Sequence, residues 1–426
     1  MSAAFALTRS VLVIGDGIVG IAAAIAMRRA LPGAAVTLLQ LPPNPDGWIN
    51  RLGAAGPVIH KFHRQIGLDP RLFVQRAGAQ PVHLRRYVGP GQPDLREACT
   101  AAIPFVEGVP LHHIWLRHGA STGEAKPDFA AMLLALRDAH GDEGGFGVRF
   151  HAPAYADLLA DMAAALNIVR CDSADIQVEA DGERIDGVTT SDATLTADLY
   201  IDAAGPRSRL LTALGTEWCD WATSLTPRAL TIVPEGAGAP GEETLTTASS
   251  CLHWQTPLWR ATVIPASGPA TGRLHHSAQA NAVAIGEAAV HAPVADGMLL
   301  GTALEDILRL ITLLPRPGGD DRDSSEYVRR TAIAHDALAD WSGLCFMADG
   351  APCPDSLAAI LAAFDARGRI APRELDPITP GAWLARLMAL RPPPRRIDPT
   401  ALALPEEIVR MTIARAAESG VTTTPR

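Results

Sequence analysis

Three glycines at the spacing Gly-x-Gly-x-x-Gly constrain the fold more than any other feature of this 426-residue chain. Gly15, Gly17 and Gly20 stand between the aliphatic run SVLVIG at 10–15 and an apolar stretch that begins IVGIAAAIA. A second aliphatic run, AAVTLLQ at 34–40, closes the unit. A strand, a glycine turn, a helix and a second strand within roughly 30 residues make a βαβ unit. The pattern predicts an α/β protein with a Rossmann-like nucleotide-binding core.

Each glycine has a physical role in such a turn. Gly15 permits the tight turn, Gly17 lets a pyrophosphate approach the backbone, and Gly20 lets the helix pack closely on the strand. The first helical residues, Ile18 and Val19, present the N-terminal end of the helix to the phosphates. We therefore expect these five residues to bind the cofactor.

Gln40 ends the second strand, where a dinucleotide site usually has an acidic residue. Its amide oxygen can accept a hydrogen bond from a ribose hydroxyl, but it brings no negative charge. We expect Gln40 to contact the cofactor in a site with modified ribose recognition.

Two later stretches indicate which nucleotide is bound. Residues 196–211 have the pattern of a strand that ends in a turn of small residues. Residues 281–315 have the pattern of a strand, a loop with Gly286 and Glu287, and a long helix. Flavoproteins with two dinucleotide-binding units return such elements to the first unit, which favours FAD over an NAD-dependent dehydrogenase. We expect Gly286 and Glu287 near the ribityl chain or the phosphates, with a solvent-facing Glu287 as the alternative.

Several stretches follow an order that resembles the flavin-dependent tryptophan halogenase family, including a shorter bacterial branch of it. They are HKFHRQIGLDPRLFVQRAGA (60–79), VPLHHIWLRHG (109–119), FHAPAYADLLADMAAALNI (150–168), DLYIDAAGPRSRLL (198–211), AVAIGEAA (282–289), PDSLAAILAAFDARGRI (354–370) and PGAWLARLMALRPPPRRIDP (380–399). The resemblance implies a flavoprotein enzyme whose reduced FAD comes from a partner flavin reductase. In that family reduced FAD reacts with dioxygen, a halide is oxidised, and a lysine relays the halogen to an aromatic small-molecule substrate.

The resemblance also implies where the family's catalytic residues would lie. The family lysine corresponds to His83, which can act as an acid or base but lacks the amine. The family glutamate corresponds to Ala295, and the halide-binding pair corresponds to Gly297 and Met298. The backbone N–H of Gly297 can still bind an anion.

Two further family features are altered. The flavin loop corresponds to LGAAG at 52–56, without the family's acid, and the resemblance implies cofactor contacts at Ala54 and at Leu299. The Trp-x-Trp-x-Ile-Pro signature corresponds to WQTPLWRATVIP, in which Trp254 and Trp259 stand at a different spacing. We expect these two rings in the core or in a pocket wall.

The function hypothesis is an FAD-dependent oxidoreductase that uses reduced flavin and dioxygen on an aromatic small molecule. The lysine, the glutamate and the double-Trp signature are altered together, so halogenation itself is doubtful. A flavin monooxygenase is one alternative, because oxygen transfer needs none of these residues. A catalytically degenerate family member that acts as a binding protein is another.

We predict an FAD-binding Rossmann-like core of the two-dinucleotide-domain type, assembled from 8–110, 150–215 and 280–316. A β-rich insertion at 216–280 would carry the substrate-facing sheet, and 325–426 would form a C-terminal helical region.

Composition excludes several other classes of protein. A net charge of -9 argues against a nucleic-acid partner. Glycines interrupt the apolar run at 11–28, and the N-terminus lacks a signal-peptide pattern, so we expect a cytoplasmic protein without a membrane span. The six cysteines form no CxxC pair, and His112 and His113, expected in a strand, would point to opposite faces, so no metal site is predicted. A homodimer stays an open alternative.

Overall fold

We describe the fold from a computed structural model. It describes residues 8–15, 17–89, 94–100, 102–121, 128–139, 146–248, 251–266, 270–294, 296–314, 322–347, 350–371 and 373–421. Ala295, which corresponds to the family glutamate, lies outside these residues.

A mostly parallel six-stranded sheet forms the centre of the fold, in the order β10-β2-β1-β14-β22-β21. Only β21 runs antiparallel to its neighbour. The strands are β1 (Ser10–Gly15), β2 (Ala35–Gln40), β10 (Val169–Asp172), β14 (Leu199–Ala203), β21 (Ala278–Gln279) and β22 (Ala282–Ala284). The predicted Rossmann-like core is therefore confirmed, with the first βαβ unit at the boundaries that its glycine pattern indicated.

The two faces of this sheet bury different layers because successive side chains of a strand point to opposite sides. Val11 and Val13 pack in the cluster that contains α1, whereas Leu12 and Ile14 pack in the cluster that contains β12. The surrounding elements are α1 (Ile18–Ala30), α6 (Ala152–Ala165), α7 (Arg209–Ala213), α8 (Met298–Thr312), β11 (Gln177–Ala180), β12 (Ile185–Thr189) and β13 (Thr194–Leu195).

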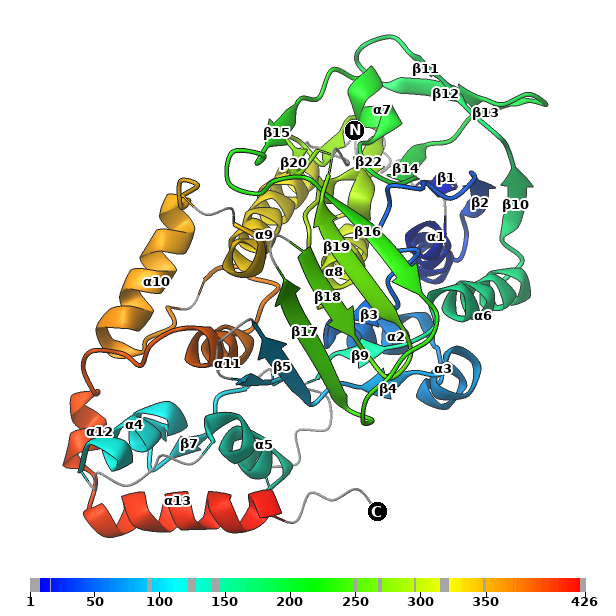
Figure 1. The fold of residues 1–426 in the computed structure, drawn as a ribbon. Coiled ribbons are helices and arrows are strands. Elements are labelled where there is room, and N and C mark those ends of the chain that lie inside the picture. The colour runs from blue at the N-terminus through cyan, green and yellow to red at the C-terminus, as the bar shows by residue number, and fades with distance from the viewer. Residues whose placement is uncertain are drawn as a thin grey trace, which may run out of the picture.

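A second six-stranded sheet has the order β16-β19-β18-β17-β5-β6. Its strands are β5 (Leu84–Val88), β6 (Leu95–Ala98), β16 (Arg228–Val233), β17 (Glu242–Ala248), β18 (Cys251–Gln255) and β19 (Arg260–Pro265). Four strands come from the range predicted as the β-rich insertion. The other two, β5 and β6, come from the range predicted for the FAD core, because β5 pairs in parallel with β17. The sheet thus joins segments from both ranges (Figure 1).

The C-terminal region is helical, as predicted. It contains α9 (Arg322–Phe346), α10 (Asp355–Arg367), α11 (Pro380–Leu390), α12 (Pro399–Ala403) and α13 (Glu406–Val421). Figure 1 shows α12 and α13 beside α4 (Leu111–Ser121) and α5 (Phe129–Ala139), at one end of the molecule. No helix in the described part of the chain is long and apolar enough to cross a membrane.

The prediction of a strand at His112 and His113 is wrong. Both residues lie in α4, where Leu111, Ile114 and Leu116 bury an apolar helical face. Residues 111–114 are all buried, so this short run shows neither the period of a helix nor that of a strand. The structure shows that it is helical. His112 Nε2 lies 2.7 Å from the Gly368 carbonyl oxygen. Among the described residues no group of three or more His, Cys, Asp or Glu could hold a metal ion.

Short elements complete the chain. They are β3 (Ala54–Ala55), α2 (Val58–Ile66), α3 (Pro70–Ala77), β4 (Gln80–Pro81), β7 (Phe105–Val106), β8 (Val109–Pro110), β9 (Val148–Arg149), β15 (Trp218–Asp220), β20 (Gly272–Leu274), the 3-10 turn η1 (Gly286–Ala288) and β23 (Val290–His291).

Candidate functional site

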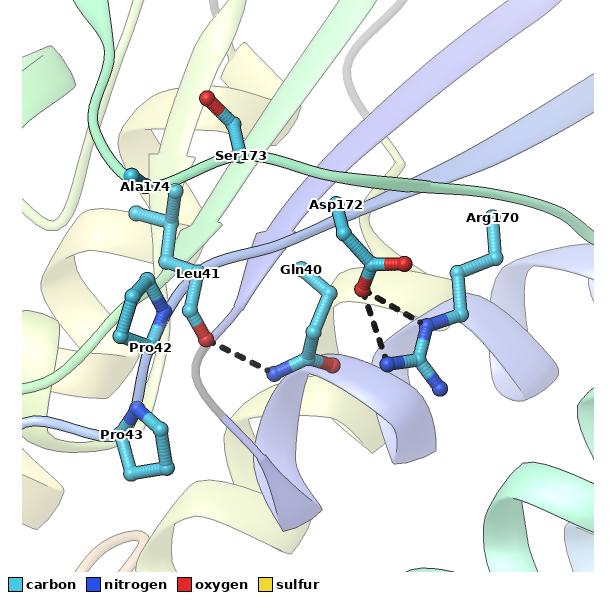
Figure 2. Close-up of a pocket in the computed structure, with 8 residues that line it drawn as sticks. All are labelled: Gln40, Leu41, Pro42, Pro43, Arg170, Asp172, Ser173 and Ala174. Carbon is cyan, nitrogen blue, oxygen red and sulfur yellow. Dashed lines mark hydrogen bonds and ion pairs between the residues drawn. The ribbon is translucent and has the colours of Figure 1, made fainter.

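An open cavity of about 550 Å³ lies at the carboxyl ends of β2 and β10. Its lining residues are Gln40, Leu41, Pro42, Pro43, Arg170, Asp172, Ser173 and Ala174 (Figure 2). Gln40 Nε2 donates to the Leu41 carbonyl oxygen at 3.1 Å. Ligands of open α/β sheets bind outside the carboxyl ends of the strands, so the cavity has the position expected for an adenosine group.

The glycine turn has the predicted close contacts. A Cβ atom added to Gly15 would lie 2.6 Å from Gly20 Cα, so α1 and β1 could not keep their distance with larger residues there. The Ile18 N–H, at the start of α1, donates to Asn50 Oδ1 at 2.9 Å. A Cβ atom on Gly17 would lie 2.3 Å from the same Asn50 oxygen. An acceptor oxygen thus already occupies the end of the helix where a phosphate oxygen would bind.

The segment 42–51, which we call the cofactor-facing loop, contacts two more parts of the expected FAD site. A Cβ atom on Gly205, after β14, would lie 2.7 Å from Asn44 Cβ. The backbone N–H groups of Trp48 and Ile49 donate to Glu287, at 2.8 and 2.9 Å from Oε1 and Oε2 respectively. The loop therefore bridges the start of α1, the turn after β14 and η1.

Glu287 is buried, with 5% of its surface exposed, so the solvent-facing alternative is wrong. Besides the loop amides, its Oε1 lies 3.0 Å from His291 Nδ1. Beside it, Gly286 adopts φ 65°, and a Cβ there would lie 3.2 Å from Val19 Cγ1. The structure thus brings η1 to the start of α1, as the FAD hypothesis requires.

Two features of the structure fit the adenosine half of FAD. One is the open cavity beside Gln40, and the other is the Ile18 N–H at the start of α1, which already donates to an acceptor oxygen. Gly15, Gly17, Ile18, Val19 and Gly20 would hold the pyrophosphate on α1. The cofactor-facing loop would have to give up its contacts with Ile18 for that.

Three further predicted residues, Gly297, Met298 and Leu299, lie at the start of α8. Gly297 has φ 82°, and a Cβ there would lie 2.5 Å from the Ala54 carbonyl carbon, so the two segments touch. The Met298 N–H donates to Asp296 Oδ1 at 3.2 Å. Leu299, the next residue of α8, is buried in the core. A side-chain carboxylate therefore already binds one of the two amides that correspond to the halide site.

Six charged side chains form a buried ion network on the face of the second sheet covered by α9 and α11. Its members are Arg85, Glu97, Arg149, Glu243, Asp296 and Arg386, each with a side chain exposed by 5% or less. Three are cationic and three are anionic, so the network is neutral when all are ionised. Burying charges is costly unless they are paired, and all six are.

The pairing within the network is close. Arg85 lies 2.9 Å from Glu97 and 2.6 Å from Glu243, and Arg149 lies 2.8 Å from Glu243. Arg386 extends the network from Glu97, at 3.1 Å, to Asp296, at 2.8 Å. Burial alone would raise the pKa of the Glu243 carboxyl, but Arg149 and Arg85 outweigh it and hold the pKa below its ordinary value.

Tryptophans enclose the network. Trp254 Nε1 donates to Glu243 Oε2 at 3.0 Å, and the Trp254 and Trp259 rings meet edge to face at 4.8 Å. Trp341 Nε1 donates to Asp296, and the Arg386 guanidinium lies 3.5 Å from the centroid of the Trp341 ring. The expectation that Trp254 and Trp259 are core residues is confirmed by their burial.

Two cavities adjoin the network. The smaller, of about 60 Å³, is lined by network residues and by Pro57, Val82, Cys99, Thr100, Gly147, Met298, Trp341, Thr379 and Ala382. The larger, of about 140 Å³, is lined by Tyr87, Val88, Gly89, Leu95, Leu245, Thr247, Leu252, Leu344, Cys345 and Leu390. Charged network residues line part of the first, whereas mainly aliphatic side chains line the second.

His83 does not line either cavity. Its ring packs edge to face on Phe146 at 4.9 Å, beside Gly241, while its neighbour Val82 lines the smaller cavity. In the wall of the cavity that Met298 lines, this segment therefore contributes Val82 and not His83. The sequence contains two lysines, the exposed Lys61 on α2 and Lys126 outside the described residues.

The parallel sheet, its glycine turn and the returning β22–η1–α8 segment are the fold of an FAD-binding flavoprotein. A family model described as tryptophan halogenase matches residues 10–264, and the chain belongs to this family of enzymes. A search of curated proteins finds no match.

Solved structures show the same fold. BrvH, a flavin-dependent halogenase from Brevundimonas sp. BAL3, has a TM-score of 0.81 and 20% identity, over 98% of both chains. Xcc4156, a flavin-dependent halogenase from Xanthomonas campestris, has a TM-score of 0.84 and 19% identity, over 98% of this chain and 96% of that one. The tryptophan 6-halogenase SttH from Streptomyces toxytricini has a TM-score of 0.81 and 16% identity, over 97% and 96%.

The sequence pattern did not indicate the buried ion network. The sequence carries one sign of the network, which is charged residues inside strands. Arg85 and Glu97 interrupt the otherwise apolar inward-facing positions of β5 and β6. Asp296 adjoins the position of the family glutamate, but its bond to Met298 N–H became apparent only from the loop geometry.

Proposed function

We propose that the protein is an FAD-dependent oxidoreductase that transfers oxygen, rather than a halogen, to an aromatic small molecule. The observation that carries this proposal is the Asp296 carboxylate bonded to the Met298 N–H at the start of α8. A halide at Gly297 and Met298 would lie beside that buried negative charge, and like charges repel strongly where water is excluded.

The surrounding charges offer a halide no compensation. Each of the three network guanidiniums contacts at least one network carboxylate. Lys61 is exposed on α2, so no lysine in the described part of the chain can act as the amine relay. Within the described part of the chain, the residues that correspond to the family's anion site and relay therefore do not favour halogen transfer.

Oxygen transfer needs neither. Bound reduced FAD supplies two electrons to dioxygen, so that reduced FAD, dioxygen and an aromatic C–H give oxidised FAD, an aromatic C–OH and water. As in the family, a flavin reductase is the proposed source of reduced FAD. The cavity of about 140 Å³ beside Tyr87 is mostly apolar. An apolar cavity of roughly 150 Å³ accepts a benzene-sized ring, so this cavity suits one aromatic ring of the substrate.

Titration of the purified protein with FAD tests the first requirement of the proposal. We expect a saturable change in visible flavin absorbance and in flavin fluorescence. A colourless protein without FAD binding into the high micromolar range would overturn the proposal.

That negative result would favour a second function, a binding protein that keeps the fold without the cofactor. A contact of the cofactor-facing loop supports this candidate, because Asn50 already satisfies the Ile18 N–H that a phosphate of FAD would use. The same titration therefore separates the two functions.

A further inference from the structure

We propose that Asp172, the last residue of β10, supplies the ribose-binding carboxylate that Gln40 does not supply on β2. This inference rests on the proposed binding of FAD, whose adenosine half would lie in the cavity of about 550 Å³. The glycine pattern places the ribose-binding residue at the end of β2, whereas this inference places it at the end of β10.

The strand register puts the two residues next to each other. In the parallel pairing of β10 with β2, Asp172 pairs with Gln40, and each is the final residue of its strand. Both line the cavity, and Figure 2 shows their side chains at the same edge of the sheet. A carboxylate one strand away from the usual position can therefore reach the same ligand.

The hydrogen bonds favour Asp172 over Gln40 as the acceptor. Gln40 directs its amide nitrogen to the Leu41 carbonyl oxygen. Asp172 uses Oδ1 to accept from Arg170, at 3.1 Å from Nε and 2.9 Å from a terminal nitrogen. Among the described residues nothing donates to Oδ2, which leaves this oxygen available to a ribose hydroxyl.

The charge of Asp172 defines the class of nucleotide. A carboxylate accepts from vicinal ribose hydroxyls through charge-assisted hydrogen bonds, which are roughly twice as strong as neutral ones. The cavity should therefore take adenosine nucleotides with free ribose hydroxyls, such as FAD and ADP, more tightly than their 2′-deoxy forms.

The experiment compares FAD, ADP and 2′-deoxy-ADP binding to the full chain by fluorescence and calorimetric titration. We expect the wild type to bind ADP more tightly than 2′-deoxy-ADP. Asp172→Asn should weaken FAD and ADP by about tenfold, the effect of losing a hydrogen bond to a charged group. The variant should also bind ADP and 2′-deoxy-ADP equally, a result that a general loss of stability would not produce.

Two further variants complete the test. The exposed Asp192→Asn, in the turn between β12 and β13, should bind as the wild type does. Gln40→Glu should restore tight binding when combined with Asp172→Asn, because it returns a carboxylate to β2. Unchanged affinity and unchanged discrimination in Asp172→Asn would overturn the inference. ADP binding without FAD binding would overturn the proposed function alone, and binding of neither nucleotide would overturn both.

Discussion

In the buried ion network, Glu243 accepts hydrogen bonds from Arg85, from Arg149 and from the Trp254 indole N–H. Glu243→Gln removes the negative charge and leaves two buried guanidiniums with less compensation. We expect a loss of about 3–5 kcal/mol in the free energy of unfolding, as for other broken buried pairs. Urea denaturation measures it.

Glu326→Gln is the matched control, because Glu326 pairs with Arg329 and Arg330 at the surface of α9. An exposed pair contributes about 0–1 kcal/mol, so the control should unfold almost as the wild type does. An equally small loss for Glu243→Gln would contradict the assignment of a charged network.

His63 predicts a pH dependence of stability. Burial in α2 lowers the pKa of the His63 imidazole from 6.5 to about 3, and its Nε2 lies 2.9 Å from the Tyr155 hydroxyl. Between these pKa values the unfolded chain binds a proton that the folded chain does not. The free energy of unfolding should therefore fall as the pH is lowered through this window.

Thermal unfolding of wild type and His63→Gln across that pH range measures the contribution. The variant should lose part of the acid sensitivity, whereas the exposed His253→Gln should keep the slope of the wild type. Identical slopes in all three proteins would show that His63 does not stay neutral in the fold.

At the scale of elements, the cofactor-facing loop competes with the cofactor for the start of α1. Asn50 Oδ1 accepts from the Ile18 N–H, the group that a phosphate oxygen would use. Asn50→Ala removes the competing acceptor and should tighten FAD binding by up to about fivefold, the equivalent of one net hydrogen bond.

Asp46→Ala, an exposed change in the same loop, is the control and should leave the FAD affinity unchanged. Flavin fluorescence titration provides the readout. Weaker binding in Asn50→Ala would mean that Asn50 is a ligand of FAD instead of a competitor.

The loop before α8 depends on a close approach of two segments. Gly297→Ala would combine a positive φ with a Cβ atom 2.5 Å from the backbone of Ala54 and Ala55. We expect a loss of more than about 2 kcal/mol in unfolding free energy, from backbone strain and overpacking together. Urea denaturation of the variant measures the loss.

Gly182→Ala separates these two costs, because Gly182 also has a positive φ but nothing lies within 4 Å of its added Cβ. It should cost about 1 kcal/mol, the strain alone. Equal losses in both variants would remove the evidence for tight packing of Gly297 on Ala54.

Elements with a local signature were predictable from the sequence. The glycine turn fixed β1, α1 and β2, since its spacing has a direct steric cause in the contact between Gly15 and Gly20. The pairing of β5 with β17 was not predictable, because it joins residues 84–88 to residues 242–246 without any motif. For the same reason the sequence pattern assigned β5 and β6 to the FAD core range.

At the scale of the whole molecule, the chain combines the fold of the solved halogenases with a buried ion network in its interior. The fold positions η1, α8 and the start of α1 as an FAD-dependent enzyme requires. The network is neutral when all its members are ionised, and its Asp296 adjoins the residues that correspond to the halide site.

The resemblance predicted the fold, but it could not predict which residues meet in the interior. Arg386 and Glu97, for example, are 289 residues apart and meet only in the folded protein. Sequence spacing carries no information about such a pair. Asp172 is a comparable case, since only the register of β10 on β2 brings it to Gln40.

Oxygen transfer without halogenation is seen most directly in the product of the reaction. The protein would be incubated with FAD, a flavin reductase, NADH, isotope-labelled dioxygen, bromide and a panel of indole, phenol and tryptophan. Mass spectrometry should find a product with one labelled oxygen atom and no bromine, in the same yield with and without bromide. A brominated product that forms only when bromide is present would contradict oxygen transfer as the activity of this protein.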